Sequence, residues 1–316
     1  MNSSVAILGG GRLAQSVAAI LNAAGADVRV WTRRKAARAG LAKKELGTVV
    51  ETVADACLDA GLVIFAVPAG GFREVAAAFG EVARGDQIVL HATRGVEEGF
   101  VLPSRILREE TCIRKVGVLG GPLHFKDLTS GRPIAAVMAT RYDDAYASVR
   151  ATVGGQNVHL HRSRDLIGVE VAGLVANISA LAVGICDGLG LGDTARGVIL
   201  TRGLVEASKL GGVLGATRDT FSGLAGVGDL IPRKVSSTHR HHKVGEALAA
   251  GQKLEDALGP IRGEVEGILA AQEATRLAGR RGLELPLIHA VDMLVHGEAD
   301  PRAALDEILQ LDLELG

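Results

Sequence analysis

The chain has 316 residues, which favours two domains because single hydrophobic cores stop growing at about 250–300 residues. Hydrophobic residues make up 47% of the chain and aromatic residues 3%, so the interior must consist mainly of Ala, Val, Leu and Ile, as in closely packed helices and parallel strands. A formal net charge of −1 gives no reason to expect binding to nucleic acid or to a membrane surface. Any phosphate must therefore be bound by local basic groups.

The three cysteines are odd in number and have no C-x-x-C spacing, which argues against a disulfide framework or a zinc site and favours a reducing cytoplasm. The N-terminal VAILGGG lacks the basic region of a signal peptide and is typical of a buried strand. The apolar run at residues 171–186 is shorter than the ~20 residues needed to span a bilayer and contains Asn177 and Ser179. We therefore expect a core helix there and no membrane insertion.

The first 34 residues have the pattern of a dinucleotide-binding unit. SVAILG (residues 4–9) predicts a buried strand, GGRLAQSVAAILNAAG a helix, and DVRVWTRR a second strand. This context makes Gly9-x-Gly11-x-x-Ala14 a credible fingerprint, although an ordinary tight turn has the same glycines. We expect the cofactor pyrophosphate at the start of the helix, against Gly9, Gly11, Arg12 and Leu13.

The second strand ends in Arg33 and Arg34, where NAD-preferring domains usually carry an acidic residue. Guanidinium groups offer charge-assisted bonds to a 2′-phosphate, so the sequence favours NADP(H), with NAD(H) as a possible second cofactor. The alternative is that both arginines simply begin the exposed basic run RRKAARAG.

Further strands are expected in LVIFAV, QIVLHA, KVGVLG, IAAVMAT and NVHLHRS. Beyond them the apolar residues recur at three-four spacing, which predicts helices to the end of the chain. The fold class is therefore α/β, with an N-terminal Rossmann-type doubly wound sheet followed by an all-helical substrate domain. We place the cofactor domain at residues 1–162 and the helical substrate-binding and catalytic domain at residues 163–316.

The helical half begins with a helix that is apolar on every side, DLIGVEVAGLVANISALAVGICDGLGLG, and is therefore buried. It leads to TFSGLAGVGDL, where glycines precede a single carboxylate, Asp229, and then to Arg240 within a histidine cluster. An acid, an arginine and histidines are thus expected to converge near the buried helix.

Four motifs in this half resemble the bacterial type of NAD(P)-dependent glycerol-3-phosphate dehydrogenase. They are G-V-E-x-x-G-L-x-x-N (168–177), D-G-L-x-x-G (187–192), L-T-R-G-L-x-E (200–206) and T-F-x-G-L-A-G-x-G-D-L (220–230). The resemblance covers nearly the whole chain. It implies hydride transfer between NADPH and dihydroxyacetone phosphate or sn-glycerol 3-phosphate, a step that supplies glycerophospholipid precursors, and a small phosphorylated substrate.

The resemblance also implies roles for single residues. Asp229 and Arg240 match the family's substrate-site aspartate and phosphate-anchoring arginine and are expected to be catalytic, and Arg240 would also contact the cofactor. Pro68, Phe125 and Glu266 match cofactor-side positions, Gly121, Thr220 and His239 substrate-side positions, and Arg94 both. A homodimer in the cytoplasm is expected.

The chain departs from the family where the chemistry is most demanding. The family's proton-transferring lysine precedes Asn177, and here that position is Ala176. Arg94 replaces a second lysine and keeps the charge, but it cannot release a proton near neutral pH. A polar substrate-facing position has become Leu123, and His124 and Asp127 also differ.

A histidine is one candidate for the missing proton donor, because histidine titrates near neutral pH. We expect His241 to be this replacement catalytic donor, with His124 and Lys126 as further candidates; a solvated H-R-H-H loop is the alternative. These histidines lack metal-ligand spacing, so no metal site is expected. The loss at Ala176 leaves two other functions open: a non-catalytic NADP(H)-binding protein, and a reductase of another small hydroxy acid.

Overall fold

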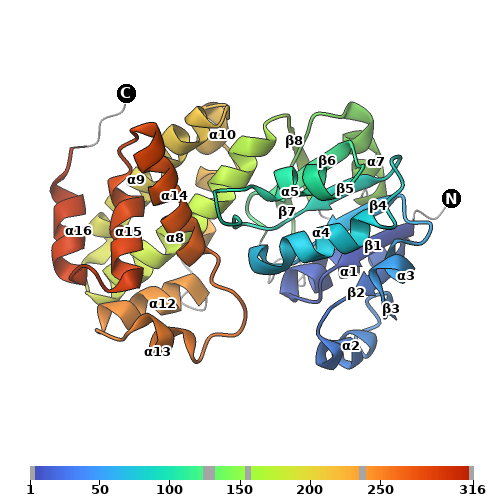
Figure 1. The fold of residues 1–316 in the computed structure, drawn as a ribbon, viewed down its shortest axis with the longest axis horizontal. Coiled ribbons are helices and arrows are strands. Elements are labelled where there is room, and N and C mark those ends of the chain that lie inside the picture. Colours follow the sequence, from blue (N-terminus) through green and yellow to red (C-terminus); the bar gives the residue numbers. More distant parts are fainter. Residues whose placement is uncertain (1–3, 124–131, 154–157, 235–239, 313–316) are drawn as a thin grey trace. The chain divides into compact units, whose positions relative to one another are not determined.

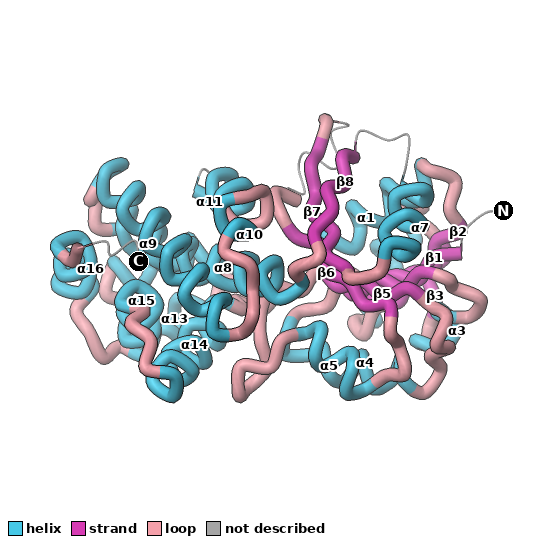
Figure 2. Tube along the Cα trace, turned by 90° about the horizontal axis from the view of Figure 1, so that it is seen from above, coloured by secondary structure: helices cyan, strands magenta, loops and turns pink. Residues whose placement is uncertain are grey.

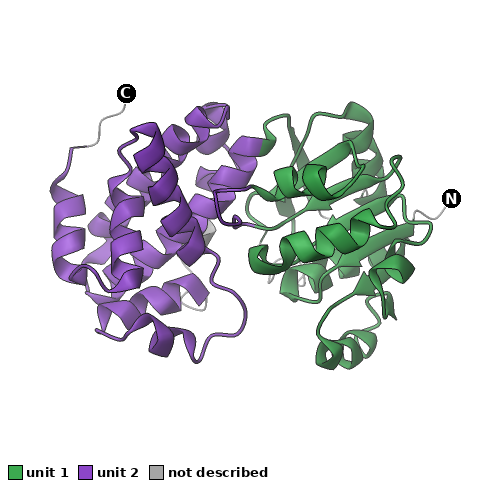
Figure 3. Ribbon diagram, in the orientation of Figure 1, with its two compact units in different colours: residues 1–93, 102–166 green, residues 94–101, 167–316 purple. Residues whose placement is uncertain are grey.

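The computed structural model describes residues 4–123, 132–153, 158–234 and 240–312, without the side chains of residues 232–234. The chain divides into two compact units (Figure 3). Unit 1 comprises Met1–Thr93 and Leu102–Leu166, and unit 2 comprises Arg94–Val101 and Ile167–Gly316. The chain thus passes from unit 1 into unit 2 at Arg94 and returns to unit 1 after Val101.

Unit 1 is built around one eight-stranded sheet in the order β3-β2-β1-β4-β5-β6-β7-β8. All neighbouring strands are parallel except β6 and β7, which are antiparallel. The strands are β1 (Ser4–Leu8), β2 (Asp27–Trp31), β3 (Thr48–Val50), β4 (Leu62–Phe65), β5 (Ile88–His91), β6 (Lys115–Gly120), β7 (Ile134–Thr140) and β8 (Val158–Ser163). The Rossmann-type sheet predicted from the sequence is confirmed, with β3 as an additional edge strand.

Helices cover both faces of this sheet (Figure 2), which is why its central strands are apolar on both sides. They are α1 (Arg12–Ala23), α2 (Lys35–Ala42), α3 (Val53–Cys57), the 3-10 turn η1 (Ala69–Gly71), α4 (Phe72–Gly80), α5 (Pro103–Glu110) and α7 (Asp143–Val153).

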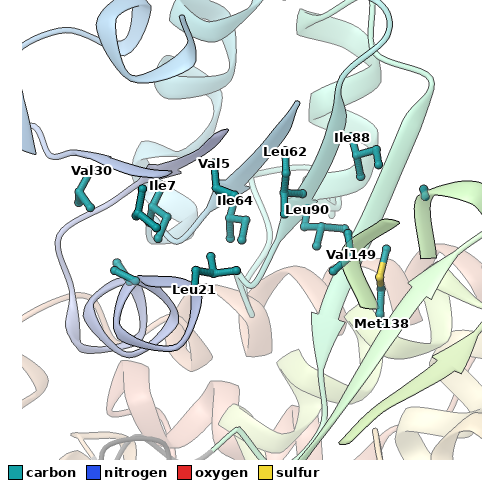
Figure 4. Close-up of a cluster of buried hydrophobic side chains, with 14 of the residues drawn as sticks. Val5, Ile7, Leu21, Val30, Leu62, Ile64, Ile88, Leu90, Met138 and Val149 are labelled. Carbon is teal, nitrogen blue, oxygen red and sulfur yellow. The ribbon is translucent and has the colours of Figure 1, made fainter. Parts of the chain in front are cut away.

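Alternate residues of each strand point to opposite faces, so each strand contributes to two cores. On one face, Ile7, Ile64 and Leu90 pack with Leu21 of α1 and Val149 of α7 (Figure 4). On the other, Phe65 of β4 packs against two rings of α4, with centroids 5.3 Å from Phe72 and 5.6 Å from Phe79.

Among the described residues of unit 2 the regular secondary structure is helical, apart from an isolated bridge between Glu97 and Val101, as the sequence predicted (Figure 1). Its helices are α8 (Leu166–Gly188), α9 (Gly192–Val213), α10 (Asp219–Ser222), α11 (Val227–Lys234), α12 (Arg240–Ala249), α13 (Leu254–Leu258), α14 (Gly267–Arg281), α15 (Pro286–His296) and α16 (Pro301–Gln310). Helix α8 passes a length and composition test for a membrane span, but 94% of its most apolar window is buried inside the protein. It is the core helix of unit 2.

Glycines bring α8 and α12 into backbone contact. A Cβ on Gly184 would lie 2.1 Å from the carbonyl oxygen of His242, and one on Gly245 would lie 2.2 Å from that of Leu181. Any larger residue would push the helices apart. This close approach fixes the first turn of α12, which carries Arg240 and His241, against the buried helix.

Candidate functional site

The turn after β1 has the geometry that a pyrophosphate requires. Gly9 has φ +138°, and a Cβ there would lie 2.3 Å from the carbonyl oxygen of Ala66, so only glycine fits. At Gly10, a Cβ would lie 2.7 Å from the hydroxyl of Thr32. At Gly11 no described atom lies within 4 Å of an added Cβ, so the space over this glycine is open to the close approach that a dinucleotide requires.

Helix α1 begins directly after this turn, with Gly11 as its N-cap. Because glycine has no side chain, Gly11 forms no side-chain hydrogen bond to the start of the helix, and the first turn of α1 has no acidic residue. Arg12 is exposed and Leu13 is half-buried at the helix start. The N–H groups and positive dipole end of the helix suit an anion, so these residues fit a dinucleotide phosphate.

The two arginines after β2 lie in different settings. Arg33 Nη1 donates to Glu74 Oε2 of α4 at 2.6 Å, and both side chains are largely exposed. Arg34 is also exposed and is the N-cap of α2. Pro68, another predicted cofactor residue, is exposed and is the N-cap of η1 after β4.

Unit 2 brings Arg94 and Asp229 together although 135 positions separate them in the sequence. Arg94 Nη1 donates to Asp229 Oδ2 at 2.5 Å, and the two side chains are 14% and 5% exposed. Asn177 Nδ2 of α8 donates to the backbone oxygen of Arg94 at 2.9 Å. A Cβ on Gly173 would lie 3.3 Å from Arg94 Cγ. Arg94 therefore extends along one face of α8.

Ala176 belongs to that same face of α8. Ala176 lies three residues after Gly173, so the two are neighbours on the helix surface, and Ala176 is buried. The position that matches the family's lysine is thus one helical turn from Gly173, the residue that Arg94 approaches. The Arg94 guanidinium thus brings a positive charge to a neighbourhood in which this chain lacks the charge of the family's lysine.

A second group of predicted residues lies at the starts of α12 and α14. Arg240 Nη2 is 3.4 Å from Glu266 Oε2, and the arginine side chain remains 38% exposed, while Glu266 is buried. The ring of His241 is fully buried, and its Nε2 accepts a hydrogen bond from the backbone N–H of Gly267 at 3.0 Å. An acceptor nitrogen in a buried ring favours a structural role for His241 over proton donation.

The remaining predicted residues are distributed more widely. Gly121 follows β6 in unit 1, is buried and has φ +82°. Thr220 is half-buried in α10 of unit 2, and Leu123 is half-buried after Gly121. His124, Phe125, Lys126, Asp127 and His239 lie outside the described residues.

Sequence reasoning missed the residues that hold Arg94 in place. Glu273 of α14 is buried, and its Oε2 accepts from the N–H of Gly99 at 2.9 Å, so it fixes the far end of the segment Arg94–Val101. Its other oxygen accepts from Arg276 at 2.7 Å. A glutamate in a helix resembles any exposed helical glutamate in sequence, so this role had no sequence signal. Asn177 stood in a motif and could have been included.

Comparison with known proteins decides the family. A family model for the NAD-dependent glycerol-3-phosphate dehydrogenase N-terminus matches residues 4–146, and the model for the C-terminus matches residues 165–306. The chain belongs to this family. The resemblance inferred from its motifs is thereby confirmed.

Individual relatives agree along the whole length. The glycerol-3-phosphate dehydrogenase (NAD(P)+) of Synechococcus elongatus is 35% identical over 98% of this chain and 96% of the relative. That of Corynebacterium glutamicum is 32% identical over 93% of each chain. The crystal structure of glycerol-3-phosphate dehydrogenase from Coxiella burnetii superposes with a TM-score of 0.93 at 27% identity, covering 98% of this chain and 99% of that one.

More distant structures share the fold alone. A ketopantoate reductase from Ralstonia eutropha superposes with a TM-score of 0.62 at 18% identity, over 97% of this chain and 99% of that one. The confirmed fold class is therefore shared with oxidoreductases of other substrates, so the fold alone does not specify the substrate.

Proposed function

We propose that the protein reduces dihydroxyacetone phosphate to sn-glycerol 3-phosphate with NADPH, as an NAD(P)-dependent oxidoreductase of the glycerophospholipid precursor pathway. The observation that carries this proposal is the buried Arg94–Asp229 pair, which the motif residue Asn177 of α8 holds through the backbone of Arg94. Arg94 would supply a fixed positive charge to stabilise the oxygen of a ketone substrate.

Unit 1 contains residues that would hold the cofactor. The glycine turn and the start of α1 suit the pyrophosphate, and Arg33 and Arg34 suit the 2′-phosphate of NADP(H). Bound NADPH supplies the hydride. Positioning it is the task of this chain, because the cofactor carries the redox chemistry itself.

In unit 2, we assign charge stabilisation to Arg94 and not proton donation. As hydride reaches the carbonyl carbon, negative charge develops on the carbonyl oxygen, and a preorganised guanidinium stabilises it. Arginine stays protonated at all ordinary pH values, so the proton for the alkoxide comes from solvent. Asp229 and Asn177 hold Arg94 in one orientation. Arg240, 38% exposed and only loosely paired with Glu266, is the proposed phosphate anchor.

Because Ala176 cannot transfer a proton, we expect the enzyme to be slow for its family. A positioned proton donor contributes about 10² to 10⁴ in rate. Absorbance of NADPH, followed with dihydroxyacetone phosphate and with other small keto acids, tests the assignment. Turnover fastest with dihydroxyacetone phosphate supports it. Tight NADPH binding without turnover on any of these substrates would instead favour the non-catalytic binding protein that Ala176 also permits.

The cofactor preference gives a separate prediction. Replacing Arg33 and Arg34 together with Ala should remove most of the preference for NADPH over NADH, because each charge-assisted contact contributes on the order of 1.5–3 kcal/mol. Dissociation constants for both cofactors, measured by titration, provide the readout. Arg108→Ala in α5 is a control for the loss of an arginine. A double variant that discriminates as well as its parent would show that these arginines do not read the 2′-phosphate.

The proposal includes a cytoplasmic location and a homodimer. The absence of C-x-x-C spacing and the buried state of α8 support the former. The apolar composition of the helical half supports the latter, which sedimentation of the purified protein tests directly.

A further inference from the structure

The ion pair between Arg33 and Glu74 lies where the two cofactors differ chemically. Arg33 follows β2, and its guanidinium also lies over Gly71, where an added Cβ would be 3.5 Å from Nη2 and 3.7 Å from Nη1. Glu74 projects from the first turn of α4 to meet it at 2.6 Å. The arginine that we assign to the 2′-phosphate is thus already in contact with a carboxylate.

The sheet topology places this pair beside the cofactor turn. β2 and β4 flank β1 on either side. The pairing continues past the strand ends, since Gly9 N–H donates to Trp31 O and Ala66 N–H donates to Leu8 O. Arg33 follows β2, and Glu74 follows β4 by way of η1. The contact between the Arg33 and Glu74 side chains therefore lies at the carboxyl ends of these strands, where the glycine turn begins.

Arg73, the charged residue next to Glu74, has different ion-pair partners. The adjacent Arg73 pairs with Glu109 at 2.8 Å and also with Glu110, both in α5. Arg73 is thereby directed toward α5, whereas Glu74 is directed toward Arg33. Within the described part of unit 1, the Arg33 guanidinium takes Glu74 as its ion-pair partner.

We propose that Glu74 sets the balance between NADPH and NADH by competing with the 2′-phosphate for Arg33 and by accepting a hydrogen bond from the ribose 2′-hydroxyl of NADH. Rossmann domains that prefer NAD use an acidic residue for this hydroxyl at the end of the second strand. Here that position is occupied by arginines, and α4 supplies the carboxylate instead. This inference rests on the proposed cofactor role of Arg33.

Because the pair is exposed, it adjusts the affinity for NADPH but does not prevent NADPH from binding. With side chains 64% and 67% exposed, solvent screens the attraction, and the pair can exchange Glu74 for a more highly charged phosphate. A carboxylate that remains nearby then repels the phosphate. NADPH binding is consequently weakened by Glu74, but it is not prevented.

The experiment measures dissociation constants for NADPH and NADH with the full-length parent, Glu74→Gln, Glu74→Asp and Arg33→Ala. We expect Glu74→Gln to tighten NADPH binding about three- to tenfold at low salt, with a smaller gain at high salt, and to weaken NADH binding. Glu74→Asp keeps the charge but shortens its reach, so the gain for NADPH should be smaller than with Gln. Glu81→Gln, an exposed charge at the other end of α4, is the matched control and should change neither constant.

The outcomes separate this inference from the proposal beneath it. If Arg33→Ala lowers the NADPH preference but Glu74→Gln changes both cofactors equally or not at all, the role of Glu74 is wrong and that of Arg33 stands. If Arg33→Ala leaves the preference intact, the assignment of the 2′-phosphate to Arg33 is wrong. Circular dichroism of each variant establishes that the comparison is made between folded proteins.

Discussion

Ala176→Lys combined with Arg94→Lys is expected to raise the turnover number for dihydroxyacetone phosphate by about 10², because it restores a group that can give up a proton. Ala176→Lys alone should gain less. The new ammonium would lie one helical turn from Gly173, the residue that Arg94 approaches, and two positive charges in one neighbourhood oppose each other. Arg94→Lys relieves this crowding, because an ammonium is more compact than a guanidinium, and it keeps a positive charge facing Asp229.

The pH dependence of the double variant supplies the second readout. Burial at position 176 disfavours the ammonium form of the new lysine, while Asp229 favours it, so the turnover should acquire an inflection that the parent lacks. Ala176→Met is the control for added volume without a proton. Equal turnover in the double variant and its parent would mean that Ala176 is not where proton transfer is lost.

The second large expected effect is on the free energy of unfolding and depends on Glu206. Glu206 of α9 is buried and accepts hydrogen bonds from the N–H groups of Leu287 at 2.7 Å and Ile288 at 2.9 Å, at the start of α15. Burial raises the pKa of Glu206 from 4.5 to about 7, although these two N–H groups act in the opposite direction. The folded protein therefore retains a proton that the unfolded chain has already lost.

The sign of the resulting pH dependence follows from that difference. Between about pH 4.5 and 7 the folded state binds more protons at Glu206 than the unfolded state, so this residue lowers the free energy of unfolding as the pH rises. At about 1.4 kcal/mol per pKa unit, its contribution to that change is on the order of 3 kcal/mol. Glu206→Gln should remove this slope. It should also destabilise the protein below pH 5, because a side-chain amide offers one acceptor oxygen to two N–H groups.

Denaturant unfolding at a series of pH values measures this effect. Trp31 is the single tryptophan and lies in unit 1, so its fluorescence reports that unit, while far-ultraviolet circular dichroism is dominated by helices and reports unit 2 as well. The change should appear in the helical transition. Glu284→Gln, in the exposed turn before α15, is the control. An unchanged pH slope in Glu206→Gln would show that burial does not raise the pKa of Glu206 as described.

Much of the architecture was predictable because it depends on local pattern. Short apolar runs located most of the strands, and the uncharged stretch after Glu170 predicted the buried α8. The three-residue edge strand β3 was missed because it has too few residues for a periodic signal.

The site was less predictable, since its contacts join distant segments. Motifs located Asp229 and Arg94, but no pattern indicates that two residues 135 positions apart are in contact. The same holds for Glu273 with Gly99 and for Glu74 with Arg33. His241 illustrates the opposite difficulty. Its role as proton donor stays a prediction, because no sequence pattern indicated its burial or its bond to Gly267, which are properties of the folded state alone.

The pH dependence of the turnover number of the native enzyme, with NADPH and dihydroxyacetone phosphate both saturating, tests the central claim most directly. If Arg94 stabilises the developing charge and solvent supplies the proton, turnover is measurable and stays level between about pH 6 and 8, because a guanidinium does not titrate there. An inflection near pH 6.5 that disappears in His241→Ala, together with at least a tenfold loss of turnover, would contradict this account and identify the histidine as the donor.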